Sequence, residues 1–429
     1  MSSFLYQISR FTAVAIVCIF LLSDMYSFER LSILICSLII FLTNSYLYEK
    51  KNRYFNVTYS IYFVVVFLSM NIGPFSYIHN DIMLSTIDRV PIASIPKDHY
   101  QFYAIVYFFV SFFFLIYNCV TSKREIYISI EPNSSHPLKV MLASFIFIFP
   151  MFIFGGDLFR KSLVAFCCFY FLCFMSKPKK DRINKITMIG LCLSVVVILS
   201  QITWRFVLIQ YMLPIIYIYV FLFTSKSNVI NFFSKVKIIV LLILFGFLAI
   251  ISEMHKLGLE LTEVNIVSLF SNYELLIHWI NRQVYRIVGI WTVLGGNIID
   301  YTDIHGFFWG ITYIKILSPI FGFDYVSLPE ISATLVGANY AQPGLVAEGY
   351  ANFGLFGAII NLLLAMILSE CMWCLFIRKQ NGLRLLLSIL PFTSIIVDGG
   401  SINSVIYNSV FVLITMSFTI FIWRAKNVV

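Results

Sequence analysis

The chain contains about twelve apolar segments that are long enough to cross a lipid bilayer, and these segments constrain its fold more than any other feature. A helix needs about 20 apolar residues to span the hydrocarbon core. Backbone polar groups inside lipid must pair within the segment, so the segments are expected to be helical. The sequence therefore predicts an all-α polytopic membrane protein. The segments lie near residues 4–23, 31–48, 57–78, 100–120, 138–154, 160–176, 186–204, 206–224, 237–252, 345–377, 385–398 and 402–423.

The composition excludes several classes of protein. Of the 429 residues, 60% are hydrophobic and 12% are charged, whereas a soluble globular chain carries about 25% charged residues. This excludes a soluble enzyme, a nucleic-acid-binding domain and a disordered protein. The net charge of +9 is therefore interpreted as a signal of membrane topology, and the expected partner is the lipid bilayer and no nucleic acid.

The distribution of Lys and Arg predicts the orientation, because basic residues are enriched in cytoplasmic loops. With the N-terminus in the cytoplasm, the inner connections and chain ends hold 20 of the 30 Lys and Arg residues but 5 of the 21 acids. The inner side then carries +15 and the outer side −6. This predicts a multi-pass protein of the bacterial inner membrane with both termini in the cytoplasm.

The lengths of the connections divide the chain into three parts. Residues 1–252 are expected to form a nine-helix bundle, and residues 345–429 a portion with three helices. Between them, residues 253–344 form a long periplasmic loop between helices 9 and 10, and a long structured loop usually carries function. Its two apolar stretches, 287–299 and 306–322, are too short or too interrupted to span. We therefore expect amphipathic and re-entrant or interfacial segments there.

Cations are scarce on the predicted outer side, which makes the few that occur there candidates for a site. In the long loop, His278, Arg282 and Arg286 are spaced four residues apart and share one face of a predicted helix. Paired arginines suit phosphate oxygens, although a solvated helix face is the alternative. Two outer turns hold Arg205 and Arg160, for which snorkelling toward the headgroups is the alternative.

The tenth apolar segment is expected to be one continuous helix. Residues 345–377 would be roughly 50 Å long, against about 30 Å of hydrocarbon, so the first turns would stand outside the bilayer. Glu348 and Asn352 share one face of that helix and would be free to meet a cavity. Gly354 and Gly357 fall on the opposite face, where small residues allow helices to pack closely. Alternatively, Glu348 complements the dipole at the start of the helix.

These features together resemble the O-antigen polymerase (Wzy) family. The resemblance rests on the dozen spans with basic inner loops, the long outer loop late in the chain, and the run from Pro343 through Glu348-Gly-Tyr-Ala-Asn-Phe-Gly-Leu-Phe-Gly357. The related O-antigen ligases carry a His-Asn pair upstream of their Gly-x-x-Gly. Here no His lies between His305 and the C-terminus, so the catalytic residue expected of a ligase is missing from this sequence.

The resemblance implies a substrate and a reaction. The substrate would be an oligosaccharide repeat unit on undecaprenyl pyrophosphate, and the growing glycan would move to the non-reducing end of a new lipid-linked unit at the periplasmic face. A chain-length-regulating co-polymerase is the protein partner that such polymerases imply. No phosphate-binding Gly-rich loop occurs, and the His, Asp and Glu residues of the long loop show no metal-binding spacing. Cys371 and Cys374 have CxxC spacing but lie inside an apolar segment, where buried apolar residues are expected. We therefore expect metal-independent transfer without a cofactor.

The same chemistry suggests roles for particular residues. The attacking hydroxyl needs a base, for which Glu348 is the first choice and His278 and His305 are the second. The leaving pyrophosphate needs cations near the outer interface, and the candidates are Arg282, Arg286, Arg205 and Arg160. The residues expected to line the substrate are Asn352, Tyr350 and Asp398.

Two other functions stay open at this point. A flippase for repeat units is the main alternative, because transporters place charged groups or broken helices near the bilayer midplane. Most predicted spans are free of charge in the middle, and the polar groups collect at the outer face, which favours outer-face chemistry. An O-antigen ligase is the third candidate.

Overall fold

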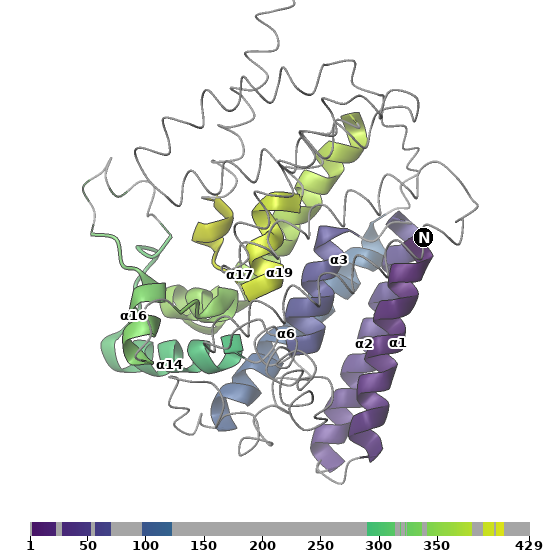
Figure 1. Cartoon of the computed structure of the whole chain (residues 1–429), viewed down its shortest axis with the longest axis horizontal. Helices are drawn as coiled ribbons and strands as arrows, with labels where there is room; N and C mark the ends of the chain where they lie inside the picture. Colours follow the sequence, from purple (N-terminus) through teal and green to yellow (C-terminus); the bar gives the residue numbers. More distant parts are fainter. Residues whose placement is uncertain are drawn as a thin grey trace, which may run out of the picture. The chain divides into compact units, whose positions relative to one another are not determined.

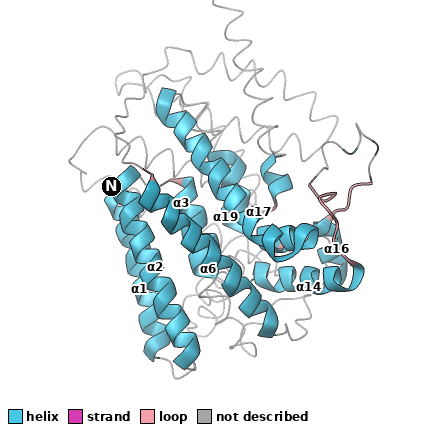
Figure 2. Cartoon of the chain, turned by 180° about the vertical axis from the view of Figure 1, so that it is seen from behind, coloured by secondary structure: helices cyan, strands magenta, loops and turns pink. Residues whose placement is uncertain are grey.

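The computed structural model describes residues 2–22, 28–52, 56–69, 97–121, 290–313, 318, 322, 324–336, 341–379, 389–398 and 400–406. These residues form helices joined by turns and contain no strand (Figures 1 and 2), which confirms the helical fold for this part of the chain. Three of the helices are long and apolar enough to cross a membrane, at Leu31–Lys51, Gln101–Val120 and Gly344–Cys374. The total of twelve spans and the side on which each loop lies remain predictions.

The first two helices form an antiparallel pair. Helix α1, Ser2–Leu22, lies along α2, Phe28–Asn52 (Figure 1). At the end where α1 begins and α2 ends, Arg10 Nη2 lies 2.8 Å from Glu49 Oε2. This ion pair joins the two helices near that end.

The third helix changes from an α-helix to a π-helix partway along its length. Helix α3, Val57–Ile61, is capped by Asn56, whose side chain accepts a hydrogen bond from a backbone N–H of the first turn. It continues as η1, a π-helical segment at Tyr62–Leu68 with wider turns. The Tyr62 hydroxyl accepts a hydrogen bond of 2.8 Å from Asn44 of α2. A buried polar contact therefore joins α2 to η1.

Helix α6, Lys97–Val120, packs against α2 and runs in the same direction. Asn44 donates a hydrogen bond to the Ser111 carbonyl at 3.1 Å. Farther along both helices, the Lys51 Nζ lies 3.8 Å from the Tyr117 ring centroid. Paired polar groups between spanning helices stabilise their association, because an unpaired polar group in hydrocarbon is costly.

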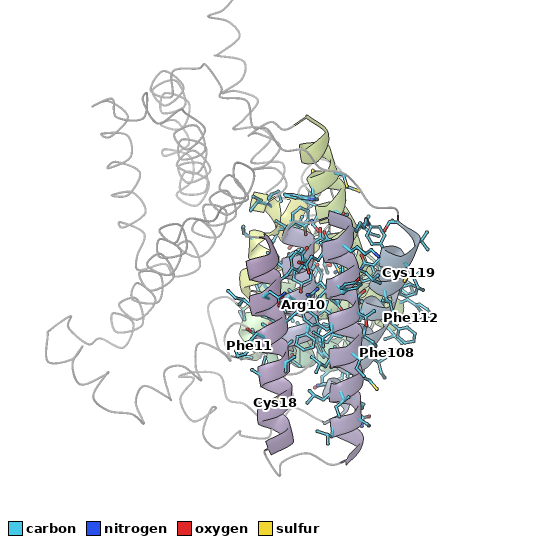
Figure 3. The ribbon with its side chains drawn as sticks, turned by 90° about the vertical axis from the view of Figure 1, so that its right-hand side faces the viewer. Arg10, Phe11, Cys18, Phe108, Phe112 and Cys119 are labelled. Atoms are coloured by element: carbon cyan, nitrogen blue, oxygen red, sulfur yellow. The ribbon has the colours of Figure 1, made fainter. Side chains whose placement is uncertain are left out.

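The outward faces of these helices are apolar. Figure 3 shows Phe11 and Cys18 along α1, and Phe108, Phe112 and Cys119 along α6. Phe11 is 76% exposed, and both phenylalanines of α6 are nearly half exposed. Large apolar side chains in such numbers on an outer surface are typical of a helix that faces lipid.

A second group of helices surrounds a small apolar core. Helix α14, Ile290–His305, and helix α16, Leu328–Leu335, pack with the start of α17, Gly344–Lys379. The core residues are Ile298, Leu328, Ala347 and Ala351. With 16 residues, α14 is about 24 Å long, which is shorter than the hydrocarbon core, as the short apolar stretch in this region had indicated.

The expected continuous helix 345–377 is wrong, because α17 is broken. Phe353 (φ −144°, ψ 22°) and Gly354 (φ 65°, ψ −151°) leave the helical conformation, and Gly354 adopts a left-handed φ that favours glycine. We call residues 344–352 the first limb and residues 355–379 the second limb of α17. The limbs run in different directions (Figure 1).

The two limbs fold back on each other at a pair of glycines. A Cβ atom on Gly357 would lie 2.1 Å from the Gly349 carbonyl oxygen, so only glycine allows this approach. Farther along, the Asn361 side chain donates to the Leu345 carbonyl at 2.9 Å. Gly357 therefore packs against the first limb of its own helix, whereas Gly354 forms the break. The remaining described elements are η4, Leu390–Phe392, and α19, Thr393–Asp398.

Candidate functional site

The polar contacts of α17 gather in two distinct regions. At the first limb, Tyr350 packs its ring on Phe102, near the start of α6, with centroids 5.0 Å apart. On the second limb, Glu370 accepts a hydrogen bond of 3.4 Å from Tyr117, near the end of α6. We call these regions the Glu348 end and the Glu370 end. They lie at opposite ends of α6.

Glu348 is buried and bound as a hydrogen-bond acceptor. Only 2% of the residue is exposed. Its Oε2 accepts 2.7 Å from the Ile402 backbone N–H and 3.2 Å from the Asn361 side chain. Ile402 begins a helix, of which the structure describes residues 402–406, and the first N–H groups of a helix have no partner within it. The carboxylate therefore binds the positive end of a different helix from its own.

Asn352 joins the first limb to the loop that follows α14. The residue is fully buried. Its amide nitrogen donates to the Thr312 hydroxyl at 2.6 Å and to the Glu348 carbonyl at 2.7 Å. Its Oδ1 accepts 2.8 Å from the Gly310 backbone N–H. The side chain thus uses both of its ends to hold residues 306–313 against α17.

The break supplies a further contact to the same loop. Because α17 leaves the helical conformation at Phe353, the Ala351 carbonyl accepts a hydrogen bond of 2.9 Å from the Phe308 backbone N–H. At the end of the loop, burial raises the pKa of the Tyr313 hydroxyl, and the nearby charge of Glu348 raises it further. The face that the sequence suggested would open to a cavity is thus packed against protein at both Glu348 and Asn352.

Accessible acids lie beside this buried centre, on α14. Asp303 is exposed, and its Oδ1 accepts 2.6 Å from the Tyr350 hydroxyl. One turn earlier, the half-exposed carboxylate of Asp300 lies 2.8 Å from Nε2 of His99, which is buried in the first turn of α6. The other ring nitrogen, Nδ1 of His99, is buried without a hydrogen-bond partner in the described part of the chain. It lies where a Cβ on Gly296 would be only 2.7 Å away.

The remaining predicted site residues fall in different places. His305 ends α14, is exposed, and lies with its ring 4.2 Å from that of Tyr301. Asp398 is the last residue of α19, four positions before Ile402 in the sequence. The candidates outside the described residues are His278, Arg282, Arg286, Arg205 and Arg160.

The Glu370 end holds a second buried acid. Glu370 is 6% exposed, and its Oε2 accepts 2.8 Å from Tyr48 and 3.5 Å from Asn56. Tyr117 donates to its other oxygen and also lies beneath the buried ammonium of Lys51. An ionisable group inside a spanning segment is costly and marks a functional or structural centre.

Sequence reasoning missed several of these groups. Glu370 was counted among the acids of the inner side, although an acid within an apolar run is itself a signal. Asp300 and Asp303 stand three residues apart at the end of an apolar stretch, a spacing that places both on one helix face. His99 gave no signal, because its partner lies 201 residues away in the sequence. Among the described residues, no group of three or more His, Cys, Asp or Glu side chains could hold a metal ion.

The described part of the chain is thus a helical protein with three candidate membrane spans, one of them a broken helix, and a polar centre at each end of α6. Comparison with known families identifies it further. The model of a family of unknown function, DUF6032, matches residues 1–428, and the chain belongs to that family. No curated protein and no solved structure matches the chain.

Proposed function

We propose that the protein polymerises a surface polysaccharide at the outer face of the bacterial inner membrane. In the proposed reaction, the bond between the anomeric carbon of the growing glycan and the pyrophosphate oxygen breaks. A hydroxyl at the non-reducing end of a new lipid-linked unit forms the glycosidic bond and gives its proton to a base. Undecaprenyl pyrophosphate leaves with the bonding electrons, so the step balances without a cofactor.

The observation that carries this proposal is the break at Phe353 and Gly354. It turns the first limb out of the direction of the second limb and brings its Tyr350 to the carboxylate of Asp303. Acid–base groups on a short helix at the end of a spanning bundle suit a reaction at the membrane surface. The predicted orientation of the chain would put this end on the periplasmic side.

The burial of Glu348 changes our assignment of the base. A base must reach the proton that it removes, and Glu348 is nearly inaccessible and already accepts two hydrogen bonds. Asp303 is exposed and is oriented by Tyr350. We therefore propose Asp303 as the base and Glu348 as a positioning residue that holds the first limb. Under this proposal the arginines Arg160, Arg205, Arg282 and Arg286 bind the pyrophosphate.

Gel analysis of surface polysaccharide from a strain lacking the gene tests the function. We expect the ladder to collapse to lipopolysaccharide core bearing one repeat unit, because flipping and ligation continue without polymerisation. Loss of every repeat unit would contradict the proposal and indicate a flippase or a ligase. A strain with Asp303→Asn should reproduce the collapse while the protein stays in the membrane, and Glu348→Gln should retain a ladder.

The flippase is retained as a second candidate because of the same break. Discontinuous helices and charged groups inside the bundle are typical of transporters, and the described residues contain both, at Gly354 and at Glu370. The gel separates the two functions, because a flippase defect removes the first repeat unit as well.

A further inference from the structure

An exposed group of aromatic rings lies next to the acids of α14. Phe307 is 41% exposed, Trp309 73% and Phe353 46%. The Trp309 ring meets the other two at steep angles, with centroids 6.0 Å from Phe307 and 6.3 Å from Phe353. We call these three residues the aromatic platform. Edge-to-face packing of this kind holds rings in fixed positions.

Hydrogen bonds hold the loop that carries Phe307 and Trp309 in one conformation. Trp309 has a φ of 51°, a left-handed conformation that a non-glycine residue adopts only when its surroundings enforce it. The enforcing contacts lie on either side of it, where the Phe308 and Gly310 N–H groups donate to Ala351 and to the buried side chain of Asn352. A strained backbone held by buried hydrogen bonds thus presents an exposed tryptophan, which is the preorganisation that a binding site needs.

The chemistry beside the platform favours an uncharged ligand rich in hydroxyl groups. Phe307 packs on Tyr350 with ring centroids 6.0 Å apart, and Tyr350 donates to Asp303. Residues 290–313 and 341–360 contain no Lys or Arg. Carboxylates repel a phosphate but accept hydrogen bonds from neutral hydroxyls. An aromatic ring beside them offers an apolar surface to a ligand with C–H groups on one face.

We infer that the aromatic platform binds a sugar ring of a neutral glycan. The apolar face of the ring stacks on Trp309, and its hydroxyls donate to Asp303 and Asp300. The inference rests on the proposed function, in which it makes this surface the site of the accepting glycan. The pyrophosphate of the donor then binds to the arginines and not to these acids.

A lipid headgroup region is the competing occupant, because tryptophans gather at membrane interfaces. Phe356 provides the comparison, since it is 75% exposed at the start of the second limb, where lipid is expected. A tryptophan that only anchors the protein in the headgroup region does not require a strained loop held by the buried amide of Asn352. The structure at Trp309 therefore favours a glycan, and the competing occupant becomes an outcome of the test.

The test measures binding of the full-length chain, in lipid nanodiscs, to an array of neutral and acidic bacterial oligosaccharides free of lipid and pyrophosphate. We expect binding to at least one neutral oligosaccharide. Trp309→Gly removes the ring and relieves the left-handed backbone, so this variant should fold normally and bind at least tenfold more weakly. Phe356→Ala is the matched control and should bind as the wild type does.

Three results would overturn the inference. The first is a wild-type chain that binds no neutral glycan, and the second is a Trp309→Gly variant that binds as the wild type does. The third is a Trp309→Cys variant that reacts with a membrane-impermeant maleimide only after detergent is added, as lipid burial requires. Peptide-level mass spectrometry separates this cysteine from the native ones.

The gene deletion keeps this inference distinct from the proposed function. If glycan binding depends on Trp309 but deletion of the gene leaves the polysaccharide ladder intact, the glycan site is supported and the polymerase function is rejected. If the ladder collapses on deletion but is normal with Trp309→Gly, and this variant binds glycan as the wild type does, the polymerase function is supported and the glycan site is rejected.

Discussion

The two buried acids of α17 are held in different ways. Glu348 accepts hydrogen bonds from a backbone N–H and an amide, and its partner Ile402 lies 54 residues later in the chain. Glu370 accepts from two phenol hydroxyls and an amide, and its partner Tyr48 lies 322 residues earlier. The first acid joins segments of the C-terminal part of the chain, whereas the second joins that part to the N-terminal helices.

The comparison shows what each kind of partner can do. A backbone N–H at a helix start is fixed in direction, so Glu348 sets the position of a whole segment. A tyrosine hydroxyl lies at the end of a long side chain, so the helices around Glu370 can shift slightly while the hydrogen bonds are kept. We therefore expect the Glu348 end to be the more sensitive to substitution.

Glu348→Ala should give the largest effect. It removes the carboxylate that accepts from the Ile402 N–H and from the Asn361 amide, and unsatisfied buried donors together with a cavity cost about 4 kcal/mol. The thermal unfolding midpoint of the purified protein in detergent measures this. Glu348→Gln keeps an acceptor oxygen and should lose less than half as much; equal losses would show that the charge, and not the hydrogen bonds, stabilises this end.

Gly349→Ala should have the next largest effect on stability. The new Cβ would lie 2.3 Å from the backbone oxygen of Gly357, so the limbs must separate, at a cost of about 3 kcal/mol. Gly296→Ala is the matched control on α14, because its Cβ would meet a His99 side-chain atom, which can move more readily than backbone. The same unfolding measurement should give a clearly smaller loss for the control, and a reversed order would contradict a glycine contact between the limbs.

At the Glu370 end, Tyr48→Phe should lower stability by about 1.5 kcal/mol, because a buried acid loses its shortest hydrogen bond. Tyr117→Phe removes a contact of 3.4 Å and should cost about 0.5 kcal/mol. Unfolding of the two variants under identical conditions gives the difference. Tyr117→Phe as damaging as Tyr48→Phe would mean that both hydroxyls are needed equally.

Asp300→Asn should affect stability as little as Tyr117→Phe does. The carboxylate is half exposed, and exposed ion pairs contribute little, so the expected loss is about 0.5 kcal/mol. A larger loss, comparable with that of Tyr48→Phe, would show that the pair of His99 and Asp300 is a structural contact as strong as those at the Glu370 end.

The sequence was sufficient for the helical fold but not for the break. Apolar length and the requirement for internal pairing in lipid predict helices. Gly349 and Gly357 lie in the same stretch and stay helical, so a glycine alone does not mark the position of the break. The break depends on contacts with Thr312, Gly310 and Ile402, none of which is local.

The same limit applies to the site. The spacing of Glu348 and Asn352 did indicate a polar pair on one helix face, and both residues are central to the Glu348 end. Whether a polar side chain faces a cavity or another segment is decided by partners distant in sequence, and these could not be inferred. Trp309 was missed for a related reason, because exposure and a left-handed φ are properties of the folded loop.

The broken helix also has a consequence for how the protein is made. Residues 344–374 form one apolar stretch that the insertion machinery meets as a single candidate segment. The first limb cannot take its final position until residue 402 has been synthesised, because the N–H that binds Glu348 belongs to that residue. During synthesis the Glu348 end therefore stays open, and its closure is a late step that follows the insertion of the second limb.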